Sequence, residues 1–90
     1  MLENLTEILA ILATILGILM SAANFPQTLK ILKRKSCADV SLATYLMLLP
    51  GASIWFLYGV SLNNLPLIIT NLVGVVSTVS VIMVYYVYKK

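Results

Sequence analysis

The chain has 90 residues, of which 61% are hydrophobic and 10% are charged, with a formal net charge of +3 and no histidine. Soluble proteins carry about a quarter charged residues, so this composition excludes a water-soluble domain. No Asp, Glu, Lys or Arg occurs from Ile8 to Leu29 or from Val40 to Tyr88. A membrane-spanning helix needs about 20 apolar residues, so the first interval fits one span and the second fits two. We therefore predict an all-α membrane protein, a bundle of three transmembrane helices in a single domain over residues 1–90.

The first span is predicted over roughly 5–29. Ser21-Ala22-Ala23 resembles a signal-peptide cleavage site, but the acidic lead-in and the long apolar run argue against cleavage. Pro26 follows with Gln27, immediately before the basic cluster. Proline removes a backbone donor and clashes with the carbonyl four residues earlier. Pro26 therefore either marks the end of this helix or forms a hinge beside a cavity.

Small and polar residues recur along this span at intervals of four, three and four, which places them on one helix face. Such a stripe either packs closely against another helix or forms the wall of a polar cavity. Its members are Gly17, Ser21, Asn24 and Thr28.

The loop predicted over 30–41 carries four basic residues and one acidic residue, Asp39. The positive-inside rule places it in the cytoplasm, together with Lys89 and Lys90 at the chain end. The N-terminus is then expected on the outer side of the inner membrane and the C-terminus in the cytoplasm. Cys37 is the only cysteine. With no partner and no metal-ligand spacing around it, we interpret it as an incidental free thiol facing a reducing compartment.

The second span is predicted over roughly 42–62 and the third over 66–88, joined by a turn at 61–65 that Pro66 closes. Pro50 and Gly51 form a weak point within the second span, and thus a hinge that competes with Pro26. Trp55 belongs either to an interfacial aromatic belt or to a binding site. Asn71 is costly to leave unpaired in hydrocarbon, so it faces a partner helix or a wet cavity. It shares the small and polar side of the third span with Thr70, Gly74, Ser77 and Thr78.

The ordered set of Pro26-Gln27, Lys35-Ser36, Ser41, Trp55-x-x-Tyr58-Gly59, Pro66 and Asn71-x-x-Gly74 resembles the SemiSWEET family of bacterial sugar transporters, part of the PQ-loop and MtN3-saliva superfamily. The resemblance covers nearly the whole chain. It implies that three helices form half of a transporter and that two parallel copies, a 3+3 homodimer, enclose the sugar path. The family's sugar-contacting tryptophan and asparagine match Trp55 and Asn71, and its Pro-Gln proline, matching Pro26, is regarded as a hinge.

Two departures from the family affect the gates. The outer loop has Asn63 and Asn64 where relatives often have charges, so Tyr58 is the better outer gate. The inner gate of some relatives is a bulky aromatic residue, and the matching place here is near Met47 and Leu48. The expected substrate-binding set is Ser21, Asn24, Gly51, Trp55, Asn71 and Gly74, and the expected hinge is Pro26 with Gln27.

The predicted function is transport of neutral mono- or disaccharides by alternating access. No proton-relay residue lies in the predicted spans, so transport is expected to be facilitated and not coupled to ions. Two alternatives stay open: a PQ-loop carrier of amino acids or other small solutes, with Asp39 as its only acidic candidate, and a non-transporting membrane assembly subunit. No nucleophile–base pair or metal cluster is visible, so we expect no enzyme, cofactor or metal. No nucleic-acid partner is expected either.

Overall fold

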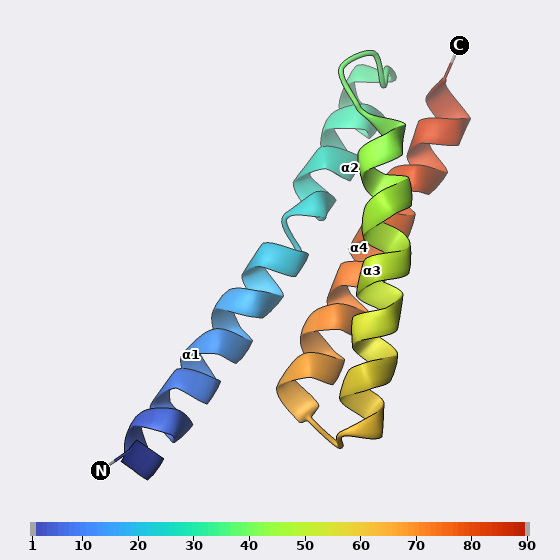
Figure 1. Ribbon diagram of the computed structural model, residues 1–90. Coiled ribbons are helices and arrows are strands. Elements are labelled where there is room, and N and C mark those ends of the chain that lie inside the picture. Colours follow the sequence, from blue (N-terminus) through green and yellow to red (C-terminus); the bar gives the residue numbers. More distant parts are fainter. Residues whose placement is uncertain (1, 90) are drawn as a thin grey trace.

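Four helices form three membrane spans in the computed structural model, which describes residues 2–89 (Figure 1). They are α1 (Leu2–Ser21), α2 (Asn24–Arg34), α3 (Leu42–Ser61) and α4 (Leu65–Tyr88). Together α1 and α2 form one span of 33 residues. With α3 and α4, the described chain therefore has three spans that are long and apolar enough to cross a membrane.

The first span is longer than the predicted range 5–29, since it begins at Leu2 and continues to Arg34. The predicted loop over 30–41 is therefore reduced to residues 35–41. The prediction ended the helix where the charges begin, and that inference was wrong. Basic residues stabilise the C-terminal end of a helix, where the backbone dipole is negative, and their long stems let the charge reach water.

The break between α1 and α2 lies at Ala22 and Ala23, one turn before Pro26. Pro26 has no N–H to donate to the carbonyl of Ala22, which instead accepts from the N–H of Phe25 at 3.0 Å. Proline thus weakens the helix on its N-terminal side. The prediction placed the weak point where the first span meets the loop. In the structure it lies within the span, and the 11 residues of α2 follow it.

The polar residues at the helix ends act as caps. The Ser41 hydroxyl accepts from the N–H of Thr44 at 3.4 Å, and the Asn64 side chain accepts from the N–H of Leu67 at 3.2 Å. Asn63 adopts a left-handed conformation with φ of 52°. The two asparagines of the outer loop therefore build the tight turn between α3 and α4.

The α4 helix lies in the middle of the bundle and packs against α1, α2 and α3. Among the described residues, α3 packs much less against α1 or α2 than against α4. The molecule measures 55 × 23 × 14 Å, so the three spans form a thin, elongated bundle. The start of α1 and the α3–α4 turn lie at one end of the bundle, and the α2–α3 loop and the end of α4 lie at the other (Figure 1).

A small hydrophobic core lies at the end that carries the α2–α3 loop. It consists of Ile31, Cys37 and Val81, with Val40, Tyr45, Val84, Tyr85 and Tyr88 packed around it. The Cys37 thiol points to the carbonyl of Tyr85, 3.7 Å away. Cys37 therefore has a packing role that the sequence did not reveal.

Candidate substrate-binding site

A cavity of about 450 Å³ opens halfway along the molecule, between the first span and α3, with α4 as its floor. It exists because the helices on either side are separated by α4 and do not close on each other. Its walls bring together residues from three elements: Met20, Ser21 and Asn24 of the first span, Met47, Leu48, Gly51, Ala52 and Trp55 of α3, and Asn71, Gly74 and Thr78 of α4.

All six residues predicted to bind substrate lie in this one cavity, although they are spread from Ser21 to Gly74 in the sequence. Met47 and Leu48, the predicted inner gate, also line it. Tyr58, Pro26 and Gln27 do not. Sequence reasoning missed Met20, Ala52 and Thr78 as lining residues. Thr78 could have been found, because it lies four residues after Gly74 on the same polar face of α4.

Trp55 presents an uncovered aromatic surface to the cavity. Its side chain is half exposed, with 54% of its surface accessible. The neighbouring ring of Tyr58 contacts it edge to face, at 5.7 Å between centroids and an interplanar angle of 76°. Tyr58 lies one turn nearer the α3–α4 turn and supports the position of the indole, although it does not line the cavity itself.

Asn71 contributes an amide from α4. Its Nδ2 donates to the carbonyl of Leu67 in its own helix at 2.8 Å. The side-chain oxygen makes no hydrogen bond to any residue of the described chain. Asn71 therefore does not join two helices, and its side-chain oxygen can accept a hydrogen bond from a ligand in the cavity.

The polar stripe of the first span is both a packing face and a cavity wall. At its two ends it packs on α4: Gly17 lies against Thr70, where an added Cβ would lie 3.0 Å from the threonine side chain, and the hydroxyl of Thr28 lies 2.7 Å from that of Ser80. In its middle, Ser21 and Asn24 reach the cavity. The stripe is thus a packing face at its two ends and a cavity wall in its middle.

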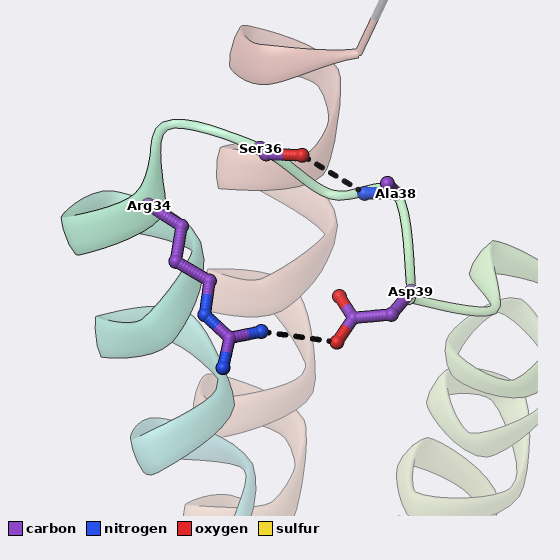
Figure 2. Close-up of polar contacts among 4 residues, drawn as sticks. All are labelled: Arg34, Ser36, Ala38 and Asp39. Carbon is purple, nitrogen blue, oxygen red and sulfur yellow. Dashed lines mark hydrogen bonds and ion pairs between the residues drawn. The ribbon is translucent and has the colours of Figure 1, made fainter.

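Charge is absent from the cavity wall, since its lining residues include no Asp, Glu, Lys, Arg or His. The acidic candidate Asp39 lies in the α2–α3 loop, where it pairs with Arg34 at 3.1 Å (Figure 2). Both side chains are exposed, with 68% and 58% of their surfaces accessible. Asp39 is therefore a surface residue with a partner and does not face the cavity.

The sequence pattern of a protein family described as "Sugar efflux transporter for intercellular exchange" matches residues 7–90. The chain belongs to this family. It is 38% identical to a sugar transporter SemiSWEET of Bradyrhizobium diazoefficiens, over 59% of this chain and 62% of that one. It is 34% identical to a sugar transporter SemiSWEET of Leptospira biflexa, over 79% of this chain and 76% of that one.

The fold matches a solved structure described as a bacterial homologue of SWEET transporters, with a TM-score of 0.83 and 34% identity. The match covers 90% of this chain and 98% of the other. The predicted family and the predicted all-α fold with three spans are thereby confirmed. Because the family consists of membrane transporters, the chain is a multi-pass membrane protein and not an enzyme.

Proposed function

We propose that two parallel copies of this chain transport neutral mono- or disaccharides across the inner membrane by facilitated alternating access. The observation that carries the proposal is the uncharged cavity in which Trp55 and Asn71 face a common space. The relatives named as sugar transporters support the substrate class.

The chemistry of the cavity suits a sugar. A sugar ring has apolar C–H faces and polar hydroxyl edges, and the exposed indole of Trp55 offers a flat apolar surface with one donor. The amide of Asn71 can donate and accept, as a hydroxyl does. A charged group would be costly at this depth and has no counterpart on a neutral sugar.

A second copy completes the cavity. The cavity is open on one side of the single chain, which is only 14 Å thick, and the half-exposed Trp55 is left on that side. A parallel partner related by a two-fold axis along the membrane normal would cover that side with its own Trp55 and Asn71. Transporters built from parallel repeats bind substrate near the midplane in this way.

The proposed transport cycle has gates on both sides of the cavity and is not coupled to ions. Tyr58 would close the side of the α3–α4 turn, Met47 and Leu48 would close the other side, and Pro26 with Gln27 would allow the first span to bend. The lining residues include no group that could relay a proton. The basic residues of α2 and its loop favour a cytoplasmic location for that end, with the N-terminus outside.

An amino-acid or cationic-solute carrier would need an acidic group beside the path. Asp39 does not meet this need, because it pairs with Arg34 in the exposed loop (Figure 2). Its position argues against this alternative. A non-transporting assembly subunit is tested by the uptake experiment, since such a subunit would move no sugar.

The test is uptake of radiolabelled glucose and sucrose into liposomes that contain the purified protein, with the dimer checked by chemical cross-linking. Trp55→Ala and Asn71→Ala should each lower uptake at least about tenfold, because each change occurs twice per cavity, and both variants should remain dimeric. Leu57→Ala is the control, since Leu57 is exposed on the same helix and does not line the cavity. Imposed pH or sodium gradients should leave uptake unchanged.

Three results would contradict the proposal. The first is a wild-type protein that moves neither sugar. The second is accumulation above the outside concentration driven by one of the gradients. The third is full activity from a species that cross-links only as a monomer.

A further inference from the structure

The break in the first span leaves a backbone carbonyl without its usual partner. In a continuous helix the carbonyl of Ser21 would accept from the N–H of Phe25. That N–H instead donates to Ala22, at 3.0 Å. An unpaired carbonyl is costly inside a membrane, so a broken span persists only where a neighbour supplies a donor.

Ser77 of α4 supplies this donor. Its hydroxyl donates to the carbonyl of Ser21 at 2.6 Å and accepts from the Nδ2 of Asn24 at 3.3 Å. Ser21 is the last residue of α1 and Asn24 is the first of α2, so one side chain joins both sides of the break. Ser77 is fully buried, with 0% of its surface accessible.

The same hydroxyl has a second acceptor within reach. The carbonyl of Gly74, in its own helix, lies 3.1 Å from the Ser77 oxygen. A hydroxyl carries one proton and can rotate. If the first span became continuous, Ser21 could take back the N–H of Phe25 while Ser77 turned to Gly74. In that arrangement the carbonyl of Ser21 would stay paired, but the carbonyl of Ala22 would lose its donor, because Pro26 has no N–H.

The hydroxyl is also connected to the substrate cavity. Asn24 lines the cavity and donates to both Ser77 and Thr78, the latter at 3.2 Å. Ser21, the acceptor of the Ser77 proton, lines the cavity as well. A ligand that contacts Asn24 or Ser21 therefore acts on groups that hold the break.

We propose that Ser77 is a positioning residue for transport, whose hydroxyl holds the first span in its broken form and, by turning to Gly74, can release the Ser21 carbonyl to the N–H of Phe25. Its role in transport rests on the proposed function. Its effect on the conformation does not, and it can be measured without any sugar.

The conformational test uses Met20→Cys, a position in the cavity wall next to the break. The rate of alkylation by a membrane-impermeant maleimide is measured from each side of vesicles of known orientation, without sugar. The same protein without Met20→Cys gives the background from the buried Cys37. Adding Ser77→Ala should change the ratio of the two labelling rates by about tenfold, because deletion of the hydroxyl leaves Ser21 unpaired only in the broken form. Ser77→Cys keeps a weak donor and should give a smaller shift in the same direction.

Ser53→Ala is the matched control, because the Ser53 hydroxyl donates only within its own helix, to Leu49 at 2.7 Å. It should leave the labelling ratio unchanged. In liposomes, Ser77→Ala should lower the maximal rate of uptake about tenfold, while the half-saturating sugar concentration changes less than about twofold.

A dimeric Ser77→Ala protein with the wild-type labelling ratio would overturn the inference. If that variant does not fold, Ser77→Cys decides, and an unchanged ratio for it overturns the inference equally. A shifted ratio together with a wild-type protein that moves no sugar would support the inference on the conformation and refute the proposed function.

Discussion

Replacement of Pro26 by alanine should slow transport by favouring a continuous first span. Pro26 is the third residue of α2, a position whose N–H has no partner within the helix. Proline therefore costs little in the broken form. In a continuous helix the same residue would lie in the interior, where proline is about 3 kcal/mol less favourable than alanine. Pro26→Ala should thus stabilise the continuous form by up to about 3 kcal/mol, which is roughly a hundredfold change in the equilibrium.

The assay is paired on one preparation: sugar binding by calorimetry and uptake into liposomes, with thermal unfolding of the dimer as a third measurement. We expect a folded dimer of equal or higher thermal stability that still binds sugar and transports it slowly. Pro50→Ala is the comparison, because Pro50 lies inside α3, which is continuous from Leu42 to Ser61. Its replacement should change uptake less than Pro26→Ala does.

Three outcomes would refute this reasoning. Unchanged uptake by Pro26→Ala would mean that the cycle does not use the break. Loss of folding and binding together would mean that Pro26 is required for assembly. A larger loss of uptake in Pro50→Ala would move the hinge to α3.

The glycines of α3 offer further predictions. Gly59→Ala should lower the thermal stability of the dimer by about 1–3 kcal/mol, because the added methyl group would lie 2.8 Å from Leu67 Cβ and 3.1 Å from the backbone nitrogen of Ile68; an unfolding temperature equal to that of the wild type would contradict this contact. Gly51→Ala, where no atom lies within 4 Å of the added group, should leave the unfolding temperature unchanged or slightly raised. Gly51→Val should reduce sucrose uptake more than glucose uptake, because its side chain extends into the cavity, and an equal effect on both sugars would show that Gly51 does not limit substrate size.

The sequence was most informative where a property depends on neighbours within one or two turns. The number of spans follows from the length of the uncharged runs, and the turn before α4 follows from Asn63, Asn64 and Pro66. Such features need only local backbone hydrogen bonds and the match between apolar length and bilayer thickness. The error at the end of the first span came from using charge as an end signal, although Lys30, Lys33 and Arg34 are well tolerated in the last turns of a helix.

The candidate site was partly predictable, because Ser21, Asn24, Trp55 and Asn71 are conspicuous polar or aromatic residues in apolar helices and the family resemblance singled out the last two. Nothing in the sequence indicated Ser77 as the partner of the break, since a serine on a helix face usually bonds to its own backbone. Its hydrogen-bond acceptor at the break is a carbonyl 56 residues away along the chain.

The sequence by itself determined that the chain crosses a membrane three times, that proline weakens the first span and that polar residues follow one face of the first span and one face of the third. The tertiary structure alone decided that α4 lies between the first span and α3, and that a cavity forms where those two helices stay apart. The physical reason is the range of the interactions. Helix formation and capping are settled within about four residues, whereas the order of helices depends on close approaches between distant segments, such as that of Gly17 to Thr70. Those approaches join surfaces whose complementarity no single segment reveals.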